Sequence, residues 1–101
     1  MTTVPGRVAP PSPDDPQPPW ALEIRAGSDP ETPVAQLAHL ATLHVWARWA
    51  VASNPSCPPC LLAALSHDDA PLVRRAVALN RAAPKEVRRR LAVDPDERVR
   101  P

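Results

Sequence analysis

The apolar residues in the second half of the chain recur at the spacing of short amphipathic helices. Leu61, Leu62 and Leu65 follow the i, i+1, i+4 pattern of one helix face, and Asp68 then interrupts the run. A second apolar set lies between residues 72 and 79, where leucine, valine and alanine recur at helical spacing. Neither stretch reaches the roughly 12–15 residues that an isolated helix needs in water. We therefore expect pairs of short helices that are stable only when they stack.

Prolines and polar residues between these stretches predict where each helix begins and ends. Pro33, Pro58 and Pro84 each precede an apolar stretch. Proline is favoured at the first helical position, where its missing N–H costs no hydrogen bond, so we expect each to be the first residue of a helix. Asn80 follows the second stretch, and asparagine tolerates the left-handed backbone conformation that often ends a helix. We predict that conformation at Asn80.

The same arrangement repeats along the chain. Residues 54–58 align with residues 80–84 at an offset of 26, and residues 29–33 align with residues 54–58 at an offset of 25. One leucine position is shared by all three units. A period of 20–50 residues is the signature of a solenoid or array. We predict about two and a half two-helix repeats, with boundaries at 29–53, 54–79 and 80–101.

Proline is concentrated near the N-terminus. The chain of 101 residues contains 16 prolines, and residues 10–19 read Pro-Pro-Ser-Pro-Asp-Asp-Pro-Gln-Pro-Pro. Proline lacks an N–H and fixes φ, so neither a helix nor a central strand is expected there. We expect residues 1–19 to be disordered and to sample extended polyproline II conformations. The apolar segment 20–28 is expected to dock on the first repeat and to cover its open end.

The repeated unit carries a recognisable set of residues. It reads Asn-Pro-x-x-Pro, then two leucines, Asp-x-x-x-x-Val-Arg, Ala-Val-Ala and Asn, and its best copy runs from Asn54 to Leu79. In this pattern residues 29–100 resemble the leucine-rich repeat variant family. The resemblance implies an all-α, right-handed solenoid in which α-helices alternate with shorter 3₁₀ segments. HEAT-type repeats share the two-helix unit and are the near alternative, which also gives an all-α fold.

Composition excludes several functional classes. With only two glycines, Gly6 and Gly27, the chain lacks the glycine-rich loops that cradle phosphates. No apolar run approaches the roughly 18 residues of a membrane span, and none resembles a signal peptide. We therefore expect no membrane partner and a cytoplasmic location. The three histidines are scattered, with no nucleophile placed beside them, so we expect neither enzyme activity nor a cofactor.

The sharpest chemical candidate is Cys57-Pro58-Pro59-Cys60. A C-x-x-C motif can bind zinc or an iron–sulfur cluster, or act as a redox dithiol. The resemblance adds to this possibility, because the family includes a member with a cysteine-ligated iron–sulfur cluster. However, a closed metal site needs about four ligands, and the chain has only these two cysteines. We expect ordinary side chains, and we keep a metal or redox protein as the weakest alternative.

Two tryptophans lie three residues apart in the first repeat. Trp46 occupies the repeat position of Leu72, which we expect to be part of the core. Trp49 occupies the position of Arg75, which we expect to be exposed. An exposed tryptophan is a typical anchor of a protein interface. Trp49 is therefore a candidate partner-binding residue.

The last repeat carries a candidate basic surface. Arg81, Lys85, Arg88 and Arg89 follow the i, i+4, i+7, i+8 spacing of one helix face. Helical solenoids can hold a nucleic-acid backbone on such faces. No aromatic residue is interleaved for base stacking, and a solvated helix surface explains the pattern equally simply. Nucleic-acid or phosphate binding on this surface is the main alternative to a protein partner.

One arginine position recurs in all three units, at Arg48, Arg74 and Arg100. Two roles are open for this row. Each arginine could pair with a repeat-turn carboxylate, Asp68 or Asp94, and tether neighbouring repeats. Alternatively, the row could face an anionic partner. We favour the structural role, because the two aspartates recur in register with the arginines.

These patterns predict a non-enzymatic protein-interaction or scaffolding module. Solenoids expose an extended surface relative to their mass, and binding is the usual function of such surfaces. The last repeat stops at Pro101 without an evident cap. We therefore expect an exposed apolar end around Val87, Leu91 and Val99, through which copies of the chain could associate with one another.

Overall fold

The computed structural model describes residues 19–100, which form six helices. Residues 1–18 and 101 lie outside the described residues, and so does most of the predicted disordered segment 1–19. No strand occurs between residues 19 and 100, and the predicted all-α class is confirmed. The helices are α1 (Pro19–Ser28), α2 (Val34–Leu40), α3 (Val45–Ser53), α4 (Pro59–Leu65), α5 (Pro71–Leu79) and α6 (Lys85–Leu91).

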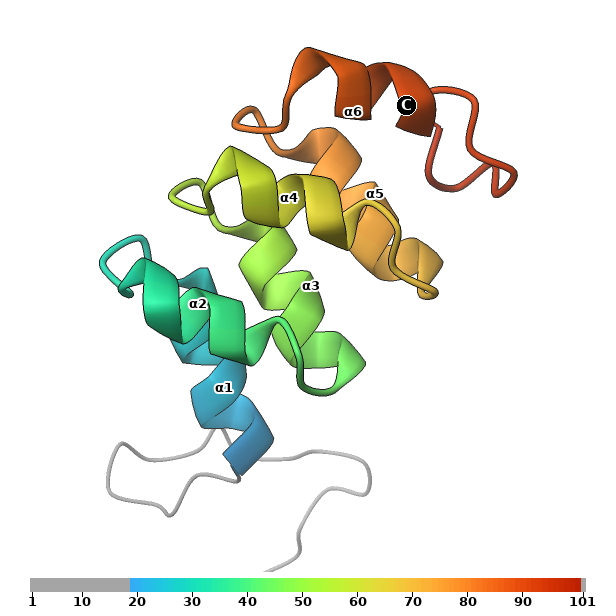
Figure 1. Cartoon of the computed structure of the whole chain (residues 1–101). Coiled ribbons are helices and arrows are strands. Elements are labelled where there is room, and N and C mark those ends of the chain that lie inside the picture. The colour runs from blue at the N-terminus through green and yellow to red at the C-terminus, as the bar shows by residue number, and fades with distance from the viewer. Residues whose placement is uncertain (1–18, 101) are drawn as a thin grey trace, which may run out of the picture.

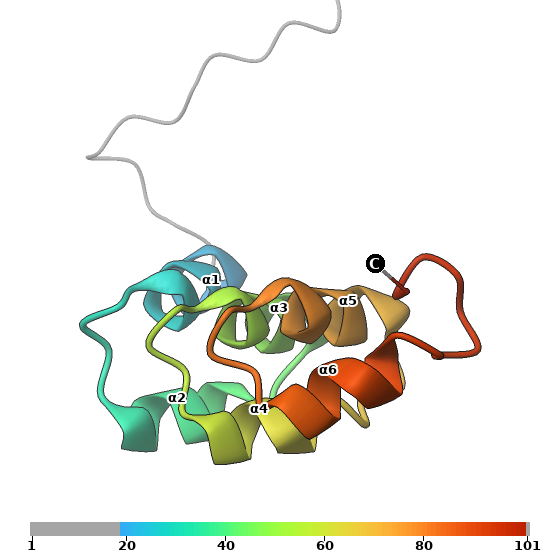
Figure 2. The same cartoon turned by 90° about the horizontal axis from the view of Figure 1, so that it is seen from above.

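The six helices form two layers. The longer helices α1, α3 and α5 lie side by side in one layer, and the shorter helices α2, α4 and α6 form the other (Figures 1 and 2). α1 lies along α3 in the same way that α3 lies along α5. The chain therefore alternates between the layers, as a helical repeat does. The shorter segments are α-helices of 7 residues, so the 3₁₀ segments that the family resemblance implied are not found among the described residues.

Aliphatic side chains fill the space between the layers. The largest fully buried ones come from both layers and include Leu37, Leu62, Val51, Val73 and Val77. Within the longer-helix layer the contact is close because the facing residues are small. A Cβ added at Gly27 would lie 2.9 Å from Ala50 Cβ and 3.3 Å from Val51 N, so the approach of α1 to α3 requires glycine there.

The prolines that precede the shorter helices are N-cap residues. Our prediction that each proline is the first residue of its helix is therefore wrong. Pro33, Pro58 and Pro84 have φ between −65° and −58° and ψ of 148–149°, an extended conformation. Each proline carbonyl accepts the first helical hydrogen bond, at 3.0–3.1 Å. Proline suits this position because its fixed φ is compatible with extended backbone and because no N–H is needed there.

Asparagine side chains connect the ends of the longer helices. Asn54 Nδ2 donates to the carbonyls of Gly27 and Asp29, both at 2.8 Å. Asn80 Nδ2 donates in the same way to Ala52 and Asn54, at 2.8 and 2.9 Å. Both asparagines are buried, and they satisfy the Gly27 and Ala52 carbonyls, which the helix ends leave without backbone partners. The Asp29 and Asn54 carbonyls also accept a backbone N–H within their own turns. We call this arrangement the asparagine ladder.

The left-handed conformation predicted for Asn80 is wrong. Asn80 has φ −82° and ψ 122°, and Asn54 has nearly the same values, so both residues are extended. The extended backbone directs each side chain toward the preceding repeat. Each Oδ1 also accepts an N–H two residues further along, from Ser56 or Ala82. The role of asparagine at these two positions is therefore to hydrogen-bond the preceding repeat, and not to adopt a left-handed backbone conformation.

Arginine–aspartate pairs connect the turns on the opposite side of the repeats. Arg74 Nε and Nη2 donate to the Asp94 carboxylate at 2.9 and 3.2 Å. Arg48 Nη2 donates to Asp68 Oδ1 at 3.2 Å. Arg48 Nε lies 2.9 Å from Asp68 Oδ2, but its N–H is not directed at that oxygen. The structural role predicted for these arginines is confirmed, and Arg100 differs, since it lies 3.9 Å from Glu97 in its own turn.

Three apolar residues of the last repeat that we expected to be exposed are covered. Val87, Leu91 and Val99 are 5%, 1% and 2% exposed. The chain after α6 folds back and places Val99 against the core, and Asp94 Oδ1 accepts the Asp96 N–H within this segment. The predicted exposed apolar end is therefore wrong, and self-association through these three residues loses its basis. The sequence did not reveal the cover because the segment after α6 has no helical periodicity.

Candidate protein-binding surface

All three tryptophans of the chain lie in the longer-helix layer. Trp20 and Trp46 are the second residues of α1 and α3, and Leu72 is the second residue of α5. Trp20 is 56% exposed, Trp46 is 51% exposed and Leu72 is 36% exposed. Together with nearby apolar residues they form what we call the tryptophan surface, which consists of Trp20, Ile24, Trp46, Trp49, Leu72 and Leu79.

The structure corrects the expectations for both tryptophans of α3, since Trp46 was expected in the core and Trp49 was expected to be exposed. Trp46 is not a core residue, because Ala47, Ala50 and Val51 fill the inner face of α3 and leave Trp46 at its outer edge. Trp49 is partly buried and packs against the core. The two rings meet edge to face, with centroids 6.2 Å apart and planes at 82°. This geometry is favourable for aromatic pairs and holds Trp46 in place beside Trp49.

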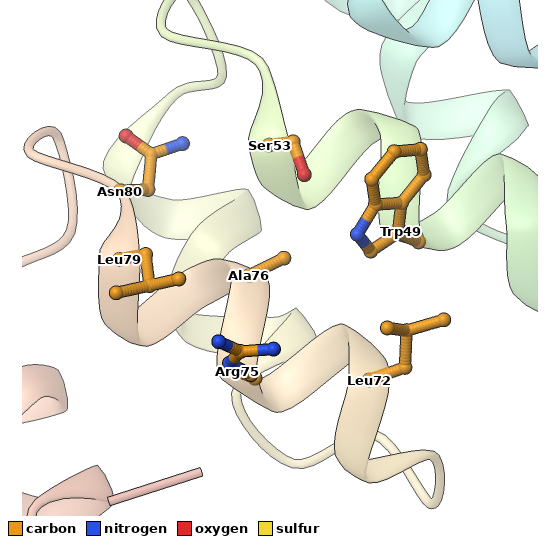
Figure 3. Close-up of a pocket in the computed structure, with 7 residues that line it drawn as sticks. All are labelled: Trp49, Ser53, Leu72, Arg75, Ala76, Leu79 and Asn80. Atoms are coloured by element: carbon orange, nitrogen blue, oxygen red, sulfur yellow. The ribbon is translucent and has the colours of Figure 1, made fainter. Parts of the chain in front are cut away.

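Two hollows flank Trp49 on this surface. The hollow between α1 and α3 is lined by Trp20, Ile24, His44, Trp46 and Trp49. The hollow between α3 and α5 is lined by Trp49, Ser53, Leu72, Arg75, Ala76, Leu79 and Asn80, and Figure 3 shows Trp49 on one side of it with Leu72 and Arg75 on the other. Among the described residues no acidic side chain lines either hollow. Most residues that line the two hollows are apolar, and the basic residues among them are Arg75 and His44.

His44 has a structural role at the edge of this surface. It is the N-cap residue of α3, and its Nδ1 accepts the Ala47 N–H at 3.3 Å. Its Nε2 contacts the Glu23 carboxylate of α1. Between α1 and α3 this contact takes the place of the arginine–aspartate pairs found between the later repeats. His44 therefore orders the boundary between α1 and α3.

The cysteine motif is divided between core and surface. Cys57 is buried and Cys60 is exposed, and both are free thiols. Burial, and to a smaller extent the neighbouring Cys60, raises the pKa of Cys57 to about 11. Cys57 also fills the same repeat position as Ala83, which is buried as well. No group of three or more potential metal ligands occurs among residues 19–100, and a protonated buried thiol is a poor metal ligand or nucleophile.

The basic residues of the last repeat lie in the other layer. Lys85, Arg88 and Arg89 are exposed on α6, where their i, i+3, i+4 spacing places them on one side. Arg81 is exposed in the loop before α6 and lines a separate hollow with Pro55 and Leu79. Arginines in the last turn of α6 also interact favourably with the negative end of the helix dipole. The structure thus separates the basic cluster on α6 from the tryptophans.

No described helix is long and apolar enough to cross a membrane.

Comparison with known proteins gives one finding: residues 21–78 match the family model of the Leucine Rich Repeat Variant domain. No curated protein and no solved structure matches the chain. The match covers more than half of the chain and begins inside α1, earlier than the residue 29 boundary that the repeat pattern suggested. The chain therefore belongs to the Leucine Rich Repeat Variant domain family.

Proposed function

We propose that this chain is a non-enzymatic protein-interaction module and that the tryptophan surface is its binding face. One observation carries the proposal: the chain has no Phe or Tyr, and its three tryptophans gather in one layer with two of them more than half exposed. A soluble domain rarely leaves several large apolar side chains exposed together without a partner.

The free thiols of Cys57 and Cys60 fit a reducing compartment such as the cytoplasm.

The energy available on this surface is sufficient for specific binding. Covering the exposed half of one tryptophan removes about 100 Å² of apolar surface from water, which contributes roughly 2–3 kcal/mol. Trp20 and Trp46 can each contribute in this way, and Trp49 forms a wall of both hollows. Tryptophans and an arginine in such positions are typical binding hot spots. The surface therefore has the residue types and the shape of a protein interface.

The test compares Trp46→Ala with Val34→Ala in the intact chain. Both residues are exposed to a similar degree, but Val34 lies on α2 in the other layer. A partner captured from extracts of the cells that make the protein should bind the wild type and Val34→Ala equally. Binding to Trp46→Ala should weaken by about 30-fold, which corresponds to roughly 2 kcal/mol. Equal capture by all three proteins would contradict the proposed binding face.

A second candidate is nucleic-acid or phosphate binding by α6, because Lys85, Arg88 and Arg89 are exposed there. The position of the aromatic residues argues against it. Proteins that bind single strands combine basic grooves with aromatic platforms, and here the two features occupy different layers. A protein partner on the tryptophan surface therefore remains the main proposal.

A further inference from the structure

The exposed apolar side chains form a row across the three longer helices. Trp20, Trp46 and Leu72 hold the same position in α1, α3 and α5, so the row runs across the helix axes. Trp49 stands beside the row and separates the two hollows. Aromatic-lined grooves of this kind are what proline-rich segments bind, because an extended proline ridge packs between flat rings. The row begins at Trp20, directly after the proline-rich part of the chain.

The proline spacing before Trp20 matches such a groove. Pro10, Pro13 and Pro16 are three residues apart. A polyproline II helix has three residues per turn, so in that conformation these prolines lie along one edge. The other prolines of the segment, such as Pro11 and Pro18, lie off this edge. In that conformation the segment would present one edge of regularly spaced prolines, the proline ridge.

Length and charge agree with this pairing. Helices in contact are about 8–10 Å apart, so the row from α1 to α5 spans roughly 16–20 Å. At about 3.1 Å per residue, Asp15 and Asp14 come to roughly 12–16 Å from Pro19, close to α5. Arg75 on α5 is exposed and lines the hollow beside Leu72. In this pairing the acidic residues of the segment would face a hollow whose charged residue, Arg75, is basic.

We propose that residues 10–18 bind intramolecularly along the row. At about 3.1 Å per residue, Pro16 of the ridge lies against Trp46 and Trp49, Pro13 lies near Leu72, and the aspartates lie near Arg75. This inference rests on the proposed function, because it assigns an occupant to the same surface. The short tether gives an effective concentration on the order of 1 mM, so a site with an intermolecular Kd of about 100 µM is about 90% occupied. A protein partner must then displace the segment, and the segment acts as a built-in competitor.

The test uses the full chain labelled with ¹⁵N and follows the indole N–H signals of the tryptophans. The ridge variant carries Pro10→Ser, Pro13→Ser and Pro16→Ser in one chain. The matched control also loses three prolines, all off the ridge: Pro5→Ser, Pro11→Ser and Pro18→Ser. The signals of Trp46 and Trp49 should shift in the ridge variant and stay in place in the control variant.

A titration with a synthetic peptide of residues 8–18 measures the competition. The peptide should bind the ridge variant about tenfold more tightly than the wild type, because the surface is vacant in the variant. Adding Trp46→Ala to the ridge variant should abolish peptide binding. Indole signals that respond alike to both sets of proline substitutions would overturn the inference. Signals that change on dilution of the wild type would also overturn it, since they would place the segment of a second copy on the surface.

These outcomes are distinguishable from failure of the proposed function. If the peptide does not bind but a protein partner still depends on Trp46, the surface is an interface and only the assignment of its intramolecular occupant is wrong. If neither peptide nor partner depends on Trp46, both proposals are wrong. The two assays use different ligands, so each result stands independently of the other.

Discussion

The Arg74 guanidinium donates four hydrogen bonds, to the Asp94 carboxylate and to two carbonyls of the preceding turn, and so connects the turns of neighbouring repeats. The substitution Arg74→Met tests how much this connection stabilises the fold. The substitution keeps most of the aliphatic length of the side chain and removes the guanidinium. Two hydrogen bonds to the Asp94 carboxylate are lost, together with those to the carbonyls of Asp68 and Asp69 at 2.7 and 3.2 Å. Asp94 is 7% exposed, so its charge remains nearly buried without a partner.

The structure sets the size of the effect. Removing one partner of a buried ion pair costs about 3–5 kcal/mol, and the Arg74 side chain is 16% exposed, so we expect about 3 kcal/mol. Arg48 is the comparison, because its side chain is 27% exposed and makes one well-directed hydrogen bond to Asp68. Arg48→Met should cost only about 1–2 kcal/mol.

Urea unfolding followed by circular dichroism at 222 nm measures both free energies. The double variant Arg74→Met/Asp94→Asn should lose at least about 1 kcal/mol less unfolding free energy than the two single variants lose in sum, because it no longer buries an unpaired charge. The reasoning is refuted if Arg48→Met destabilises the protein more than Arg74→Met, or if the two substitutions at the Arg74–Asp94 pair are additive.

The same pair predicts how stability depends on pH. The hydrogen bond from Arg74 lowers the pKa of Asp94 below its ordinary value, against the opposing effect of burial. A carboxyl whose pKa is lower in the folded state stabilises the fold above its unfolded pKa of about 3.9, and this contribution disappears as the pH falls through the folded pKa. The wild type should therefore lose stability below about pH 4 more steeply than Asp94→Asn does. Parallel pH profiles would contradict this assignment.

Three further substitutions or treatments test other features. Asn80→Ala removes two buried hydrogen bonds and leaves the Ala52 carbonyl without a donor, while the Asn54 carbonyl keeps the Cys57 N–H; it should destabilise the fold by about 2–4 kcal/mol in the same urea assay, whereas a cost below about 1 kcal/mol would rule out the ladder as a major contact. In a thiol-reagent assay at pH 8, Cys60 should react quickly and Cys57 only after unfolding, since burial keeps the Cys57 thiol protonated. If α6 binds nucleic acid, Lys85→Ala and Arg88→Ala should each lower the salt slope of binding by about one unit without changing stability, and unchanged slopes would exclude that site.

The features that the sequence predicted are those that repeat. The helical spacing of leucine and valine, the 25–26 residue period and the paired recurrence of Arg48 and Arg74 with Asp68 and Asp94 all appear in more than one unit. Because stacked repeats are in register, a pair of residue types that recurs together lies close together in space. That is why the arginine–aspartate pairing could be predicted before the structure.

The features that were missed depend on where a repeat position lies relative to the layers. Trp46 and Leu72 are apolar and in register, which suggested core, but both lie at the outer edge of their layer. Asn80 has a plausible local explanation as a helix terminator, and only the extended backbone shows that its side chain reaches the preceding repeat. Periodicity places residues in equivalent positions, but it does not say which of those positions face outward.

The contacts that stabilise the fold and the proposed binding face lie in different parts of the repeat. The asparagine ladder and the arginine–aspartate pairs connect neighbouring repeats, and the inner faces of α3 and α5 are closed by alanine and valine. The exposed positions represented by Trp20, Trp46 and Leu72 belong to neither set of connections. Replacing them should change little of the folding free energy, because they are only partly covered in the folded chain. The large side chains of Trp20 and Trp46 therefore contribute little to the fold, which is what the proposed contact with another segment or protein predicts.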